Sequence, residues 1–361
     1  MIYAVRSSFP AAGAARRRRA ATPAADRCRS LLAVAVALSL GAAAAARASD
    51  TAVPRSLLPE SAWGMLAEDP ATGQVGVAFA SSTPLAAPTY VAHEEGAGVA
   101  IVLPATTPGE SGGLLRELAK GRLPERAARR SLAEATFGPQ GAAAIVSAKG
   151  EAWVSAATGA GIVIRSGVGF AIVANRVASI SVVEQMEKVF TGARGPLPGR
   201  MLAALQAGQE AGGGALPARS ALVWVSRSAK AIDAASDGRG IDLRVDEHPF
   251  PILSLQGLAR LWRQERAVGQ AVALGEEGDW SAAARSLGRL AATEPTQGGL
   301  FYLLATTLSR SGDTAGALGA LKRTVHLEPA LADLARSDPA FAPLAPDPEF
   351  QALVGMAEPG K

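Results

Sequence analysis

Short apolar runs alternate with turns rich in Gly, Pro and Asp between about residues 60 and 255. Apolar runs of four to eight residues bounded by such turns are typical of strands. They predict strands at 63–67, 75–80, 98–103, 143–146, 152–155, 169–174, 220–226 and 241–245. Apolar positions at helical spacing predict helices at 111–118, 127–135, 182–190 and from 198 onward. Pairs of strands followed by pairs of helices favour an α+β domain at 60–255 over a doubly wound parallel sheet.

Residues 256–361 have a different pattern, almost purely helical and rich in Ala and Leu. Three features recur 34 residues apart: a Gly-Asp pair at 278 and 312, an alanine at 283 and 317, and a Glu-Pro pair at 294 and 328. This period, with small residues at the helix crossings, is typical of tetratricopeptide repeats. The sequence therefore predicts an all-α module of about two repeats, with a C-terminal cap at 338–350. An Ala-rich bundle with chance periodicity is the alternative.

Two repeats bury little apolar surface on their own, because stacked repeats usually need three or more units. We therefore expect the helix at 258–274 to pack against the first domain. We also expect residues 258–361 to be largely unfolded when they are expressed alone. The concave face of the repeats is the expected place for a peptide or protein partner.

The first 48 residues have the form of a secretory signal peptide. They carry eight Arg and one Asp, an apolar run at 31–40 and then Ala46-Arg47-Ala48, a small-x-small site that signal peptidase accepts. We expect cleavage after Ala48, a linker at 49–59 and a periplasmic or secreted protein; an uncleaved signal anchor is the alternative. The leader has a net charge of +7 and the whole chain +4, which leaves −3 for residues 49–361. This acidic remainder argues against nucleic-acid binding.

Cysteine and histidine usage excludes several kinds of site. The only cysteine, Cys28, lies in the leader, so the mature chain has no thiol for a disulfide, a zinc site or a nucleophile. The three histidines, at 93, 248 and 326, have no metal-binding spacing. No later apolar run reaches the roughly 18 residues of a membrane span. We therefore expect no metal, no cofactor and no permanent membrane span.

Three segments of the first region resemble a bacterial protein family. They lie at 68–81 (EDPATGQVGVAFAS), 190–213 (FTGARGPLPGRMLAALQAGQEAGG) and 241–252 (IDLRVDEHPFPI). They make this region similar to domain-of-unknown-function family 1028, which is placed among the Ntn-hydrolase-like folds. The resemblance implies a four-layer αββα sandwich, in which two antiparallel sheets lie between helices, often followed by an appended C-terminal module.

Ntn hydrolases use an N-terminal Thr, Ser or Cys whose own α-amine takes the proton of the hydroxyl or thiol. The family usually opens with Thr-Phe-Ser at the position where this chain has Ala62-Trp63-Gly64. Ser61 is the nearby substitute nucleophile. Its use needs either cleavage after Glu60 or a one-residue slip of the strand, which would turn every side chain to the opposite face. A solvent-exposed or strand-leading serine is the alternative.

Five polar residues are the candidates for ligand binding in the presumed cleft. The family places an Asn at Asn175, which could donate a hydrogen bond to a ligand or oxyanion; a strand-end cap is the alternative. Asp242 and Arg244 share one face of a strand and could hold a substrate or form a structural ion pair. Thr106 is retained in a segment that has otherwise lost its polar family residues, and Ser81 ends a strand near the expected cleft.

These losses favour an exported module that binds a ligand or a protein and has a degenerate hydrolase site. The alternative is an amidohydrolase that uses an N-terminal Ser exposed by processing.

Overall fold

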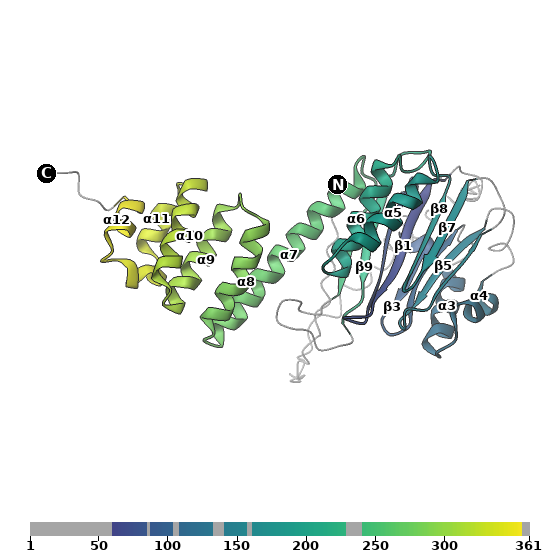
Figure 1. Cartoon of the computed structure of the whole chain (residues 1–361), viewed down its shortest axis with the longest axis horizontal. Coiled ribbons are helices and arrows are strands. Elements are labelled where there is room, and N and C mark those ends of the chain that lie inside the picture. Colours follow the sequence, from purple (N-terminus) through teal and green to yellow (C-terminus); the bar gives the residue numbers. More distant parts are fainter. Residues whose placement is uncertain are drawn as a thin grey trace, which may run out of the picture.

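The computed structural model describes residues 60–84, 87–103, 108–132, 141–156, 161–228 and 240–355. Two regions follow each other along the long axis of the molecule, a sheet domain and a helical region, and the helix α7 runs between them (Figure 1). The expected signal peptide and linker, Cys28 and Thr106 lie outside the described residues. No helix within the described ranges is long and apolar enough to cross a membrane.

The larger sheet, sheet A, is antiparallel throughout, with the strand order β10-β9-β2-β1-β8-β7. Its strands are β1 (Ala62–Asp69), β2 (Gln74–Ser81), β7 (Ile162–Gly167), β8 (Phe170–Asn175), β9 (Ser220–Val225) and β10 (Ile241–Val245). The turn between β1 and β2 is the expected Asp-Pro-Ala-Thr-Gly loop, in which Gly73 has a positive φ of 68°. A positive φ is available to glycine at little cost.

The second sheet, sheet B, is also antiparallel, with the order β3-β4-β5-β6. Its strands are β3 (Val91–Glu94), β4 (Gly98–Leu103), β5 (Ala142–Ser147) and β6 (Ala152–Ala156), and the short helix α2 (Ala87–Tyr90) precedes β3. One face of each sheet contributes to a shared apolar cluster that includes Leu66, Phe79, Ile101 and Val173. The two sheets therefore pack face to face.

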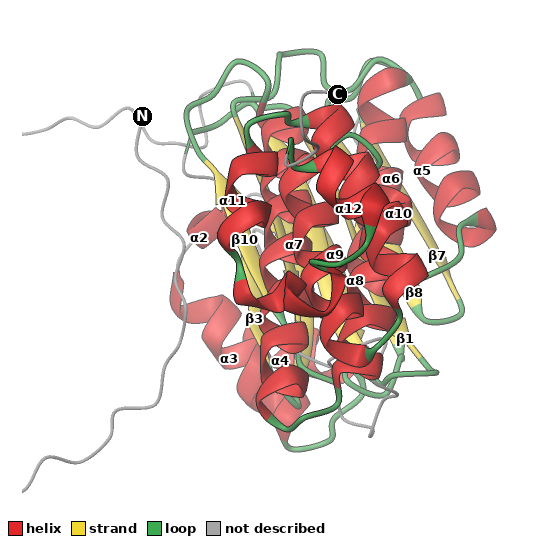
Figure 2. Ribbon diagram, turned by 90° about the vertical axis from the view of Figure 1, so that its left-hand side faces the viewer, coloured by secondary structure: helices red, strands yellow, loops and turns green. Residues whose placement is uncertain are grey.

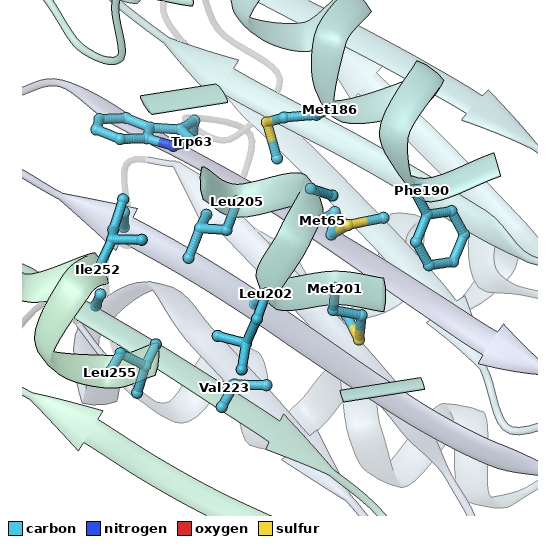
Figure 3. Packing of buried hydrophobic residues seen from close by; sticks show 14 of the residues in the cluster. Trp63, Met65, Met186, Phe190, Met201, Leu202, Leu205, Val223, Ile252 and Leu255 are labelled. Atoms are coloured by element: carbon cyan, nitrogen blue, oxygen red, sulfur yellow. The ribbon is translucent and has the colours of Figure 1, made fainter. Parts of the chain in front are cut away.

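Helices cover the outer face of each sheet. Sheet A packs against α5 (Ser181–Gly192), α6 (Leu197–Glu210) and the first half of α7 (Pro251–Glu276); sheet B packs against α3 (Pro108–Ala119) and α4 (Pro124–Ser131). The outer cluster on sheet A brings Trp63 and Met65 of β1 against Met186 of α5 and Leu205 of α6 (Figure 3). This region is the α+β arrangement of antiparallel sheets that the sequence predicts.

The C-terminal region is helical, as expected. Its elements are α8 (Trp280–Thr293), α9 (Gly298–Ser311), α10 (Thr314–Leu327), α11 (Leu331–Ser337), the 3-10 helix η3 (Pro339–Leu344) and α12 (Pro348–Leu353). The recurring Gly-Asp pairs form the same turn twice. Gly278 and Gly312 have φ values of 85° and 84°, and the next residue, Asp279 or Asp313, accepts a hydrogen bond of 2.9 Å from the third backbone N–H of the following helix.

Helix α7 belongs to both regions. Ile252, Leu255 and Ala259 are buried in the outer cluster of sheet A, whereas Ala271 is buried in a cluster with Leu287 of α8. The helix expected at 258–274 therefore begins earlier, at Pro251, and packs on the first domain only through its first half. The expected domain boundary at 255/256 lies inside this helix.

Candidate functional site

Four side chains form a row across one end of sheet A. In the register of the sheet, Ala62 lies opposite Ser81 on one side and Asn175 on the other, and Ser81 also lies opposite Ser220. Directly opposite residues place their side chains on the same face of a sheet. That face is the one turned toward sheet B, because Leu66 and Val173, at even spacing from Ala62 and Asn175, lie in the cluster between the sheets.

The two serines of this row have structural hydrogen bonds. The backbone N–H of Thr83 donates to Oγ of Ser81 over 3.0 Å, and Oγ of Ser220 donates to the carbonyl of Thr83 over 2.8 Å. Both side chains are buried. They fix the backbone that leaves β2, and this reduces their capacity to bind a ligand.

Asn175 is the polar member of the row with free hydrogen-bonding groups. Its side chain is half-buried, and within the described residues it forms no hydrogen bond. The next residue, Arg176, has a φ of 50°, in the left-handed region that non-glycine residues seldom adopt. Its backbone is held there, because its N–H donates to the carbonyl of Gly161 and its carbonyl accepts from Ala215. Such a conformation is typical of a functional loop.

Ser61 lies beside the row but on the opposite face of β1. It is fully buried. Its Oγ donates to the carbonyl of Arg176 and accepts from the N–H of Leu216, each over 2.9 Å. Its N–H donates to Oγ of Ser82 over 2.9 Å, and its carbonyl accepts from the N–H of Ser82 over 2.8 Å. Ser61 thus directly precedes β1, which is the strand-leading alternative. Its hydrogen bonds connect the segments that contain Ser82, Arg176 and Leu216.

The register also decides where the two lost hydroxyls of the family pattern would lie. Both Ala62 and Gly64 face sheet B. A Cβ on Gly64 would lie 2.7 Å from Cδ2 of Phe79, 2.8 Å from Cδ1 of Ile101 and 2.9 Å from the backbone oxygen of Ala78. Side chains of the apolar core therefore fill the place of the second hydroxyl.

Trp63, between these two residues, faces the helices. It is fully buried, and its Nε1 has no hydrogen-bond partner among the described residues. Glycines make room for the indole ring, because a Cβ on Gly208 or Gly213 would lie within 3.3 Å of a carbon atom of this ring. A buried N–H without a partner carries a desolvation penalty that phenylalanine would not have.

Asp242 and Arg244 form a second group at the edge of sheet A. They share one face of β10, as the alternation predicts, and Nε of Arg244 lies 3.3 Å from Oδ1 of Asp242. Because β10 is three strand spacings from β1, the pair lies about 14 Å from the strand that carries Ala62. The structure therefore brings Ser61, Ser81 and Asn175 to one end of the sheet and separates Asp242 and Arg244 from them.

His93 lies near this edge pair, which the sequence analysis did not anticipate. It is part of β3, is half-buried and stacks on Trp224 of β9, with ring centroids 4.3 Å apart. Burial lowers the pKa of His93 from its ordinary value of 6.5; Asp242 acts in the opposite direction, and Arg244 adds to the lowering. The neutral form of the imidazole is therefore favoured in the folded protein.

We expect this histidine to make the protein less stable in mild acid. The unfolded chain binds a proton near pH 6.5, whereas the folded chain binds it only at a lower pH. The free energy of unfolding should fall as the pH drops below 6.5 toward the pKa of the folded state. His93→Phe keeps the stacked ring without a titrating group. Thermal unfolding of both proteins between pH 7 and 5 should show a shallower decline for the variant; equal slopes would contradict this explanation.

Within the described ranges, no group of three or more His, Cys, Asp or Glu side chains could hold a metal ion. The site is thus a partly buried row of small side chains at the end of an antiparallel sheet, in which the side chain of Asn175 has no hydrogen-bond partner among the described residues. Ala62 and Gly64, where the family resemblance led us to expect hydroxyl side chains, face the other sheet. Fold and site define an α+β protein with two packed antiparallel sheets, a row of small side chains at one end of sheet A and a helical C-terminal region.

The chain belongs to DUF1028, a family of unknown function whose model matches residues 62–255. This finding confirms the resemblance on which the family expectation rested. A solved structure from the same family, protein SPO2555 from the bacterium Silicibacter pomeroyi, is 23% identical to this chain. The match covers 55% of this chain and 85% of that one, with a TM-score of 0.47. No curated protein matches the chain.

Proposed function

We propose that this protein is exported to the periplasm or secreted, and that it binds a ligand or a protein through a degenerate Ntn-hydrolase-like site. The observation that carries the proposal is the position of Ser61. Its side chain is buried on the face of β1 opposite the row, and its hydroxyl already accepts one backbone hydrogen bond and donates another. A serine nucleophile needs a hydroxyl that reaches the substrate carbonyl and a base within hydrogen-bond reach.

The residue in the nucleophile position of the family pattern, Ala62, has no group that could attack a carbonyl. The residue before it is held in place, because the backbone N–H and the carbonyl of Ser61 both form hydrogen bonds with Ser82. These contacts oppose the formation of a new N-terminus at this strand. The half-buried amide of Asn175 remains as a hydrogen-bonding group for a ligand at the row.

The C-terminal region supports a binding role. We propose that its paired helices form a tetratricopeptide-like array, since the Gly-Asp turn and its aspartate cap recur at the sequence period. The concave side of such an array is a common peptide-binding surface. The alternative function is an amidohydrolase that uses Ser61 as N-terminal nucleophile after cleavage behind Glu60.

Ser61→Ala separates the two functions. We expect the variant to lose about 1–3 kcal/mol of stability, because the N–H of Leu216 loses its acceptor. We expect no turnover of a panel of peptide and N-acyl amide substrates by either the wild type or the variant. Denaturant unfolding and product release measured by mass spectrometry test the two statements.

The control is Ser311→Ala, because within the part of the chain that the structure describes this hydroxyl donates only to the carbonyl of Leu308 in its own helix. It should change stability by less than Ser61→Ala. Amide turnover that the wild type shows and Ser61→Ala loses would overturn the binding proposal and support the hydrolase.

A further inference from the structure

Strand β10 is an edge of sheet A that carries both signs of charge. It pairs with β9 on one side, and among the described strands none pairs with it on the other. In Figure 2 it lies on the side of the molecule opposite β7, the other end of the strand order. An unpaired edge presents backbone N–H and C=O groups that can bind another strand.

The side chains of β10 alternate strictly. Ile241, Leu243 and Val245 are buried against the helices that cover sheet A. Asp242 and Arg244 point to the other face, where their side chains are 37% and 38% exposed. Natural edges are commonly protected by Pro, by Lys or by charges that repel a second copy. β10 has no Pro or Lys, and its two charges have opposite signs two residues apart.

We infer that β10 pairs antiparallel with β10 of a second copy of this chain, about a two-fold axis at Leu243. In this register Leu243 of one copy lies opposite Leu243 of the other copy. A residue one position before Leu243 therefore lies opposite the residue one position after Leu243 in the other copy. Asp242 then lies opposite the partner's Arg244, and Arg244 lies opposite the partner's Asp242. The two-fold axis creates two cross-strand ion pairs from one Asp-Leu-Arg sequence, and opposite charges at such positions stabilise a strand pair.

The buried apolar residues of β10 are also compatible with this pairing. The buried residues of β10 stay on the helix face in both copies, so the enlarged sheet keeps one apolar face and one charged face at the junction. A symmetric interface of one kind of patch is the commonest form of protein dimer. Because a five-residue strand buries a small area, we expect a weak dimer with a dissociation constant of about 10–100 µM.

Reversing the charge of either Asp242 or Arg244 tests this strand register. Asp242→Arg places two arginines on the edge, and R244D places two aspartates there. In this pairing, each single variant opposes like charges in its own dimer, so we expect self-association at least about tenfold weaker than that of the wild type. An equimolar mixture of the two variants opposes Arg to Asp at both positions. Sedimentation equilibrium of the mixture should show dimers at the wild-type level.

The double variant Asp242→Arg with R244D restores opposite charges and should dimerise like the wild type. Circular dichroism and thermal unfolding show whether each variant folds. If a single variant does not fold, the self-association of the double variant tests the register instead. An ion pair that acts only within one chain cannot produce rescue by mixing two different chains. A wild type that stays monomeric at about 500 µM, or a mixture no more associated than its components, would overturn the inference.

Discussion

Replacing Gly64 by serine should cost about 3 kcal/mol in the free energy of unfolding, even though it supplies a hydroxyl that the family resemblance leads us to expect there. The new Cβ would lie within 2.9 Å of atoms from Phe79, Ile101 and the backbone of Ala78. The backbone oxygen of Ala78 can move only with β2, and the side chains of Phe79 and Ile101 can move only by displacing other side chains of a close-packed core. Urea unfolding monitored by tryptophan fluorescence measures the change.

Gly288→Ser is the matched control for this substitution. Gly288 lies in α8, and a Cβ there would meet nothing within 4 Å. Serine also has a higher helix propensity than glycine, so we expect unchanged or slightly increased stability. A Gly64→Ser protein as stable as this control would show that the space between the sheets is open at this point. The site would then have room for a second hydroxyl.

Arg263→Pro should remove the C-terminal region from the cooperative unfolding transition, because we expect that region to be largely unfolded without the first domain. Arg263 lies in α7 between the half that packs on sheet A and the half that packs on α8. Proline removes a helical hydrogen bond and clashes with the preceding turn, which costs about 3 kcal/mol or more. Among the described elements, α7 is the one that contributes to the cores of both regions, so its interruption should uncouple them.

Differential scanning calorimetry of the full mature chain measures this effect. Arg263→Ala, which keeps the helix, should still give the single transition expected of the wild type. Two transitions in the wild type would show that the C-terminal region folds independently. A transition in Arg263→Pro with the full unfolding enthalpy of the wild type would show a further interface between the regions. The expected unfolding of an isolated 258–361 fragment stays a prediction, and the fragment would lack the turns of α7 that contain Ile252 and Leu255.

The sequence pattern was sufficient for most strands, because their apolar runs lie between Gly and Pro turns. It missed β7, where Arg165, Ser166 and Gly167 interrupt the apolar pattern. It also missed β3, which has four residues and includes two polar ones. The position of His93 on this strand, where its ring stacks on Trp224, was therefore not predicted.

The candidate site was predicted in part, since the position of a residue along a strand is easier to infer than the order of strands. The shared face of Asp242 and Arg244 follows from alternation, and the register confirms it. Their distance from Asn175 depends on β10 being the outermost strand of sheet A, which no local pattern encodes. The burial of Ser61 depends on Arg176 and Leu216, which are far from it in sequence.

The N-terminal residue that the protein has after expression of the whole chain in a bacterial host tests the central claim most directly. Intact mass spectrometry of material produced with its own leader gives this residue from the mass of the mature chain. The binding proposal predicts cleavage after Ala48 and a chain that begins at Ser49. A mature chain that begins at Ser61 would supply the free α-amine that an Ntn-type nucleophile requires, and would contradict the proposal.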